Sequence, residues 1–186
     1  LLLLMIIPLA FVRHGGQVMF AASAGLAGFG MIMIFIIQMT AGSIYLLSSI
    51  VLSLLMAGLA AGAAFAERLA LRNLKVCVAV LIGIFSVTGL LAPALVVSAN
   101  GAVLAYILVI VPVAGVITGA VYRNLTSRAE GRYTGNIYAA DTAGSALGYL
   151  VAATVLVPLA GTANACFILA LFILLSGIVA SVTYKE

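Results

Sequence analysis

Long runs of apolar residues, separated by short polar connections, are the main feature of this sequence. A membrane-spanning helix needs roughly 20 residues, because each adds about 1.5 Å across the hydrocarbon core. Six runs reach that length or come close to it, at 18–38, 44–66, 76–98, 102–122, 137–159 and 165–183. A membrane β-barrel would instead show alternating segments of about 10 residues, and the sequence has none. The pattern predicts an all-α, polytopic transmembrane helix bundle.

The opening run, residues 1–12, is too short to span the membrane by itself, because it would reach only about 18 Å at helical rise. It fits either the last part of a first span whose start precedes Leu1, or a segment lying in the membrane interface. We favour the truncated helix. Residues 1–186 then form a single transmembrane helical domain of about seven spans.

The positively charged residues alternate with the predicted spans in a way that indicates an orientation. They occupy every second connection and the C-terminal tail: Arg13, Arg68, Arg72, Lys75, Arg123, Arg128, Arg132 and Lys185. The intervening connections, 39–43, 99–101 and 160–164, carry no charge. Positive charge accumulates in cytoplasmic connections. We therefore expect the N-terminus outside and the C-terminus in the cytoplasm, in a protein of the bacterial inner membrane.

Composition excludes a soluble domain and several kinds of partner. Hydrophobic residues make up 66% of the chain and charged residues 6%, whereas a soluble domain has about 25% charged residues. The net charge of +4 comes from basic residues that form no stripe, so we expect no nucleic-acid partner. Cys77 and Cys166 lack the spacing of a zinc or redox motif, and His14 is the sole histidine. We predict no metal site and no cofactor.

Three helix-packing motifs lie inside the predicted spans. Each is a GxxxG pair, and the glycines are Gly58, Gly62, Gly115, Gly119, Gly144 and Gly148. Small residues let helix backbones approach closely, which favours association where lipid removes the hydrophobic drive between helices. We predict that these glycines pack helices together, and a substrate path lined by small residues is the alternative.

Asp141 is the only acidic residue inside a predicted span. An intramembrane carboxylate is costly and marks a functional site by default. Here the helix begins on the cytoplasmic side after a possible cap, Asn136, so its positive dipole end would favour the anion. Arg123, Arg128 and Arg132 are within reach as ion-pair partners. We favour a structural role for Asp141 as an anchor, and a role in handling protons or cations is the alternative.

Gln38, near the outer end of the span 18–38, is the second intramembrane polar candidate. It fits a hydrogen bond between helices, or the lining of an outer cavity. The sequence holds no Walker A, Rossmann, HExxH or GxSxG motif. We therefore predict no catalytic residue and no enzyme activity within these 186 residues.

Two stretches resemble a known family. The first is QMTAGSIY at 38–45, followed by LMAGLAAG at 55–62, and the second is IYAADTAGSALG at 137–148, ending in VPLAG at 157–161. Together they resemble the membrane domain of spermidine-synthase-like integral membrane proteins, which are often described as fused to a major-facilitator-like region. The resemblance covers roughly residues 29–161.

The resemblance implies a helical membrane domain that precedes a cytoplasmic aminopropyltransferase-like domain, and a cytoplasmic C-terminus fits that order. The glycine-rich loop and acidic catalytic residues of such a soluble domain have no counterpart in this sequence. Residues 18–37 also lack the glutamate that many relatives carry before the glutamine. The resemblance therefore implies the membrane module without the enzyme.

Three functions follow as hypotheses. The first is a non-catalytic membrane module that contacts the lipid bilayer and anchors or accompanies another membrane protein or complex. The second is a transporter or half-transporter for a small organic or cationic solute, with Asp141 and Gln38 lining the path. The third is a quinone- or lipid-contacting accessory subunit of an electron-transfer complex.

Overall fold

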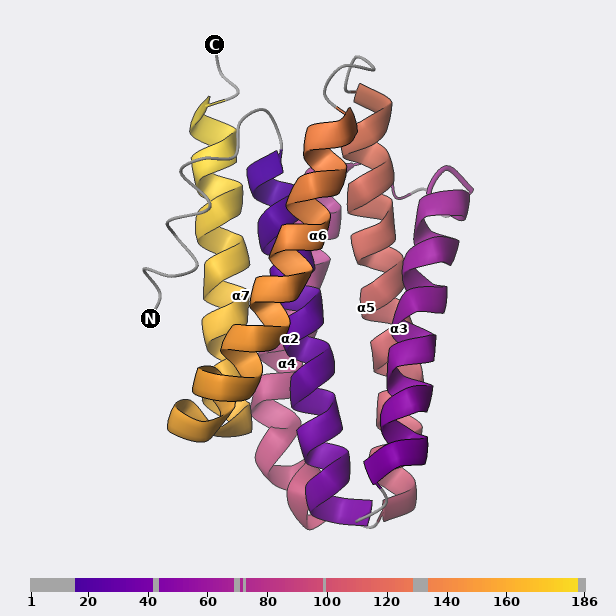
Figure 1. The fold of residues 1–186 in the computed structure, drawn as a ribbon, viewed down its shortest axis with the longest axis vertical. Helices are drawn as coiled ribbons and strands as arrows, with labels where there is room; N and C mark the ends of the chain where they lie inside the picture. The colour runs from indigo at the N-terminus through magenta and orange to yellow at the C-terminus, as the bar shows by residue number, and fades with distance from the viewer. Residues whose placement is uncertain are drawn as a thin grey trace.

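Successive helices run in opposite directions and form one bundle (Figure 1). A computed structural model describes residues 16–41, 44–68, 71, 73–98, 100–128 and 134–183, and every element in these ranges is helical. The elements are α2 (Gly16–Ala41), α3 (Ile44–Phe65), α4 (Leu74–Val97), α5 (Asn100–Arg128), α6 (Thr134–Val151), the π-helical turn η1 (Ala152–Leu156) and α7 (Val157–Thr183). The prediction of an all-helical fold is confirmed for the described residues.

Five helical segments of the described chain are long and apolar enough to cross a membrane. The last of them, Thr134–Ile178, includes α6, η1 and most of α7. It is interrupted at Gly161, where φ is 76° and ψ is 169°. Glycine adopts a positive φ without steric cost, and the chain reverses its direction between α6 and α7 (Figure 1). The predicted runs 137–159 and 165–183 lie on either side of this break, whereas residues 1–12 lie outside the described residues.

The π-helical turn before the break has an identifiable cause in Pro158. A proline cannot donate a backbone hydrogen bond and crowds the carbonyl four residues earlier, here that of Thr154. The preceding N–H, that of Val157, bonds to the carbonyl of Ala152, which lies five residues earlier and gives the π pattern. Pro158 and Gly161 together end the continuous helical stretch that consists of α6, η1 and the first residues of α7.

Helix α5 is longer than the helix that the apolar run 102–122 predicts. The run ended at Tyr122, and residues 123–136 were expected to connect two spans, but the helix continues to Arg128. The amide of Asn124, a buried side chain in this extension, donates a 2.6 Å hydrogen bond to the carbonyl of Leu71. The polar end of α5 therefore holds the connection between α3 and α4, a role that hydropathy does not detect.

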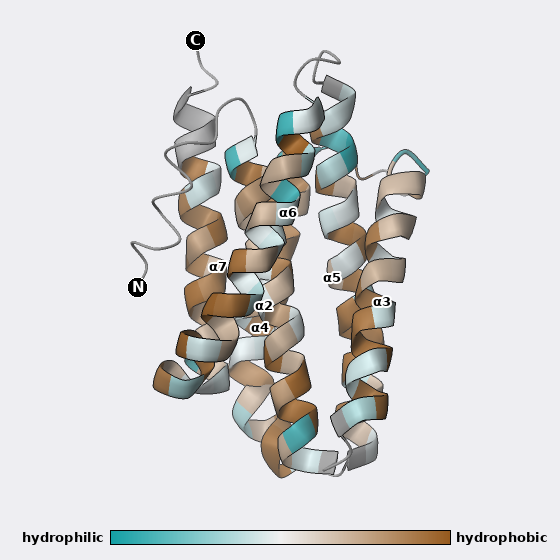
Figure 2. Ribbon diagram, in the orientation of Figure 1, coloured by the Kyte–Doolittle hydropathy of each residue, from teal (hydrophilic) through white to brown (hydrophobic). Residues whose placement is uncertain are grey.

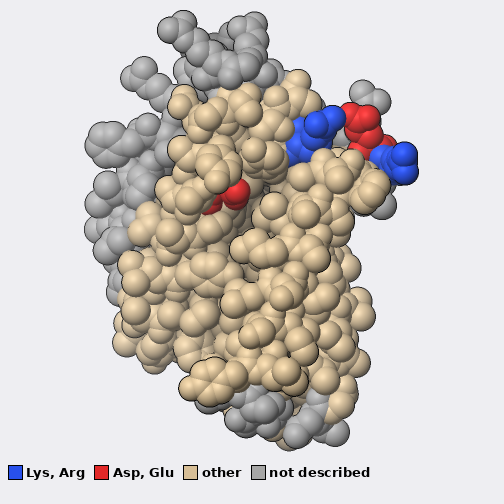
Figure 3. Space-filling model, turned by 45° about the vertical axis from the view of Figure 1, so that its right-hand side comes forward, with Lys and Arg blue, Asp and Glu red and all other residues tan. Residues whose placement is uncertain are grey.

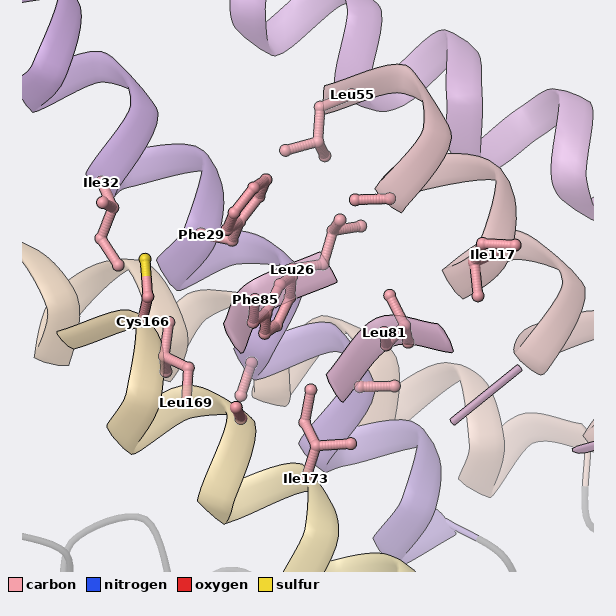
Figure 4. Packing of buried hydrophobic residues seen from close by; sticks show 14 of the residues in the cluster. Leu26, Phe29, Ile32, Leu55, Leu81, Phe85, Ile117, Cys166, Leu169 and Ile173 are labelled. Atoms are coloured by element: carbon pink, nitrogen blue, oxygen red, sulfur yellow. The ribbon is translucent and has the colours of Figure 1, made fainter. Parts of the chain in front are cut away.

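Helix α2 is the centre of the bundle. In its apolar stretch of 18 residues 89% of the residues are buried, compared with 22–39% in the corresponding stretches of the other segments. Small residues around its circumference let neighbours approach from several sides: a Cβ on Gly25 would lie 2.6 Å from Ile173 of α7, and one on Gly30 would lie 2.8 Å from Leu55 of α3. Phe29 of α2 also stacks on Phe85 of α4, with ring centroids 4.7 Å apart (Figure 4).

The outer faces of the bundle are apolar along most of its length (Figure 2). Large hydrophobic side chains are exposed on the helices around α2, including Tyr45, Leu90, Val109 and Leu159. A soluble protein would not expose so much contiguous apolar surface. The sides of this bundle are therefore suited to contact with lipid.

Candidate functional site

Asp141 lies in the second turn of α6 and faces α2. Seven residues separate it from Thr134, the first residue of the helix, which corresponds to about 10 Å along the axis. The hydroxyl of Ser23, a buried residue of α2, donates a hydrogen bond to the carboxylate oxygen Oδ1 of Asp141. A residue pair separated by 118 positions in the sequence is thus joined inside the apolar part of the bundle.

The surroundings of Asp141 differ from the expected ones in two ways. Helix α6 begins at Thr134, so Asn136 is inside the helix and is not its cap. Because the dipole effect falls off within the first turn, it contributes little at Asp141. Arg123 forms an ion pair with Glu67, with 3.4 Å between the nitrogen and the oxygen. The side chain of Arg128 and residue Arg132 lie outside the described residues.

Asp141 is the first member of a polar strip, which we define as Asp141, Ser145 and Tyr149. These residues recur every fourth position on α6, so they share one side of the helix, and all three are half-buried. The hydroxyl oxygen of Tyr149 is buried and has no hydrogen-bond partner among the described residues. A Cβ on Gly30 would lie 3.7 Å from this hydroxyl and 2.8 Å from Leu55, so the strip faces the junction of α2 and α3.

A furrow separates α6 from the helix pair α3 and α5. Helix α6 packs closely on α2, touches α5 lightly and has no substantial contact with α3. Asp141 is half-buried, whereas Glu67 is exposed and paired with Arg123. Figure 3 shows a shallow hollow beside an acidic group that lies apart from the blue side chains. The polar strip therefore begins where the furrow is open.

Gln38 does not belong to this site. It is half-buried near the end of α2, 15 residues after Ser23, which corresponds to about 22 Å along the helix. The two polar candidates of the sequence therefore lie near opposite ends of the bundle. A path that used both would have to extend along most of α2.

The glycines of the first two GxxxG motifs face each other across α3 and α5. A Cβ on Gly58 would lie 2.5 Å from the carbonyl oxygen of Pro112, and one on Gly115 would lie 2.7 Å from that of Leu55. Gly62 and Gly119 are closer still to the opposite backbone. Real Cβ atoms do not approach backbone atoms to this degree, so the two helices depend on these glycines for their contact.

The third motif packs against a helix that offers no glycine motif in return. A Cβ on Gly144 would overlap the carbonyl of Phe20, and one on Gly148 would overlap that of Ala24, with the Ala24 Cα at 2.7 Å. Gly144 follows Asp141 by three residues and so lies close to it on α6. The close backbone approach therefore also holds Ser23 within reach of the carboxylate.

The described charged residues other than Asp141 gather at one end of the bundle, which we call the charged end. Those whose side chains the structure describes are Glu67, Arg68, Lys75 and Arg123. They lie where α3 and α5 end and where α4 begins (Figure 1). Besides the ion pair of Arg123, the guanidinium of Arg68 lies 5.7 Å from the centroid of the Phe65 ring. This stacking and the exposed ion pair contribute little to stability, because both are open to solvent.

The remaining predicted groups form no site within the described chain. Cys77 and Cys166 are both buried and unpaired by any disulfide. The described residues contain no cluster of three metal-ligating side chains. His14 lies outside the described residues.

Comparison with known proteins assigns no relative: no family model, no curated protein and no solved structure matches this chain.

Proposed function

We propose that this chain is a non-catalytic integral membrane module of the bacterial inner membrane that anchors or accompanies a partner protein. The observation that carries the proposal is the separation of surfaces: apolar helix sides, and charged groups collected at one end. A partner would meet the module at the charged end, where polar contacts are available. The resemblance to membrane domains of spermidine-synthase-like proteins supports the same role.

The charged end faces the cytoplasm in this proposal. Arg68, Lys75 and Arg123 outnumber Glu67 there, which is the charge balance of a cytoplasmic face. In the proposal, the helical stretches on the two sides of the break at Gly161 are two separate crossings, which gives six crossings between Gly16 and Thr183. The proposal keeps the topology of about seven spans expected from the sequence, with the N-terminus outside; its partial first span, residues 1–12, lies outside the described residues.

Cysteine labelling tests this orientation. A Cβ at Gly101, near the start of α5, or at Gly135, near the start of α6, would meet nothing within 4 Å, so both positions accept cysteine. In intact cells we expect a membrane-impermeant maleimide to label Gly101→Cys, and to label Gly135→Cys only after permeabilisation. The parent protein is the control, since Cys77 and Cys166 are fully buried. Labelling of Gly135→Cys from outside would reverse the proposed orientation.

Handling of a small cation at Asp141 is a second candidate function, favoured by one specific observation. Among the described residues the carboxylate accepts a hydrogen bond from the neutral Ser23, whereas Arg123 is engaged by Glu67. An intramembrane carboxylate that opens to a furrow without a described cationic partner can attract a cation. This candidate adds an activity to the module and does not require it to be an enzyme.

Replacement of Asp141 by asparagine separates a structural role from this one. We expect Asp141→Asn to lower the free energy of unfolding by only about 1 kcal/mol, because the amide oxygen can still accept the Ser23 hydroxyl. Loss of one partner of a buried arginine ion pair would cost about 3–5 kcal/mol. Unfolding by a denaturing detergent measures the difference, and Ser23→Ala is the matched variant from the other side of the bond. A loss above about 3 kcal/mol would remove the cation candidate.

A further inference from the structure

The polar strip continues from Asp141 toward the C-terminal end of α6. Binding of a small cation at Asp141 does not explain this continuation. Tyr149 lies eight residues after Asp141, about 12 Å deeper along α6. Its buried hydroxyl has no partner among the described residues, although buried polar groups in proteins are nearly always hydrogen-bonded. Ser145 lies between the two on the same side of the helix.

The furrow that holds the strip opens sideways. Asp141 is half-buried and lies about 10 Å along α6 from Thr134, so it belongs to the side of the bundle and not to its charged end. Its nearest exposed neighbours on α6 include Tyr138 and Thr142, and Leu150 is exposed further down. In a bilayer this side faces lipid, so a ligand that is itself dissolved in the membrane has the most direct access.

We propose that the furrow binds a single-chain amphiphilic cation that enters from the bilayer. Its ammonium head lies at Asp141, and its chain follows α6 past Ser145 toward Tyr149. An oxygen in the chain then accepts the hydrogen bond that the Tyr149 hydroxyl lacks. This inference rests on the second candidate function, cation binding at Asp141, and adds the class of ligand and its route.

The surroundings of the buried Tyr149 hydroxyl are compatible with such a ligand. A Cβ on Gly30 would lie 3.7 Å from this hydroxyl and 2.8 Å from a methyl group of Leu55, so the hydroxyl is near the junction of α2 and α3. Helix α3 packs mainly on α5. In the proposal, side chains at this junction move and expose the hydroxyl to the ligand.

Binding to the purified chain in lipid nanodiscs tests the proposal, with empty nanodiscs to correct for partition into lipid. The probes are dodecylammonium, dodecanol, butylammonium, and a dodecylammonium-length chain with an ether oxygen placed about 12 Å from the nitrogen. We expect saturable binding of dodecylammonium at least about tenfold tighter than that of butylammonium, and none of dodecanol. The ether probe should bind several-fold tighter than dodecylammonium.

Three variants decide the outcome. Asp141→Asn should weaken binding of all three cationic probes at least about tenfold. Tyr149→Phe should abolish only the preference for the ether probe, and Tyr138→Phe, an exposed tyrosine on the same helix, should preserve it. Equal elution and melting of all variants establishes that they are folded.

The possible failures are distinguishable. If binding of none of the three cationic probes depends on Asp141, the cation function itself is wrong. If butylammonium depends on Asp141 and binds as tightly as dodecylammonium, the function stands and entry of an amphiphile is wrong. If the ether preference is absent or survives Tyr149→Phe, recognition at Tyr149 is wrong and water satisfies its hydroxyl.

Discussion

Gly148→Ala is expected to destabilise the protein, although alanine is the better helix-forming residue. In a helix without neighbours the exchange is favourable by about 0.5–1 kcal/mol. At position 148 the added Cβ would overlap the backbone carbonyl of Ala24 on α2, with the Ala24 Cα at 2.7 Å. A backbone cannot rotate away as a flexible side chain can, so α6 and α2 must separate. We expect a net loss of about 1–3 kcal/mol for alanine, and more for leucine.

Gly83 is the matched control for this prediction. It also lies in the middle of a membrane-length helix, α4, but a Cβ there would meet nothing within 4 Å. Gly83→Ala and Gly83→Leu should therefore melt at or above the temperature of the parent protein in detergent. If Gly148 and Gly83 variants melt alike, the close contact between α6 and α2 does not exist.

The consequences of Gly148→Leu should extend through the whole bundle, because α2 contacts each of the other helices. Separation of α6 from α2 also removes the donor of Asp141, since Ser23 is reached only across this contact. Backbone hydrogen exchange should consequently increase in every helix. Binding of a cationic probe at Asp141 should be lost with it.

Hydropathy predicted the position of the helices well, because the thickness of a bilayer sets the length of an apolar run. It predicted their ends less well. Helix α5 extends past Tyr122 to Arg128 because polar residues also form helix. The buried Asn124 stabilises this extension by donating a hydrogen bond to the carbonyl of Leu71. A contact between segments 53 residues apart leaves no trace in a local hydropathy average.

The central position of α2 was not evident from the apolar pattern, since every run is similarly hydrophobic. The distinguishing signal is the distribution of small residues: α2 carries them on several sides, including Gly25, Gly28 and Gly30. In lipid, where hydrophobicity does not separate inside from outside, such residues mark the helix that others can surround.

The candidate site was predicted in part. Asp141 was selected because an acid in an apolar run is costly, but its partner Ser23 is determined by how α2 and α6 pack. Ser145 and Tyr149 were missed, although their four-residue spacing from Asp141 was available in the sequence. The GxxxG motifs named the glycines without their partners: two motifs face each other, and the third faces Phe20 and Ala24.

Gly62→Leu and Gly119→Leu are expected to have a large but local effect. A Cβ on Gly62 would overlap the carbonyl of Val116, and one on Gly119 that of Leu59, so either leucine forces α3 and α5 apart. Helix α3 packs mainly on α5, and only 22% of its apolar stretch of 18 residues is buried, the smallest share among the membrane-length segments. It should therefore detach, while α5 stays in place through its contacts with α2 and α4.

Hydrogen exchange measured by peptide distinguishes this local effect from a global one. In Gly62→Leu, exchange should rise in α3 and on the facing side of α5, and stay near that of the parent in α2, α4, α6 and α7. Leu59→Ala is the control on the same helix, because it removes side-chain volume without inserting an atom between the backbones. The Thr88 hydroxyl and the Tyr106 hydroxyl, 2.7 Å apart, keep α4 and α5 joined in either variant. Uniform loss of protection in Gly62→Leu would mean that α3 is as essential to the bundle as α2.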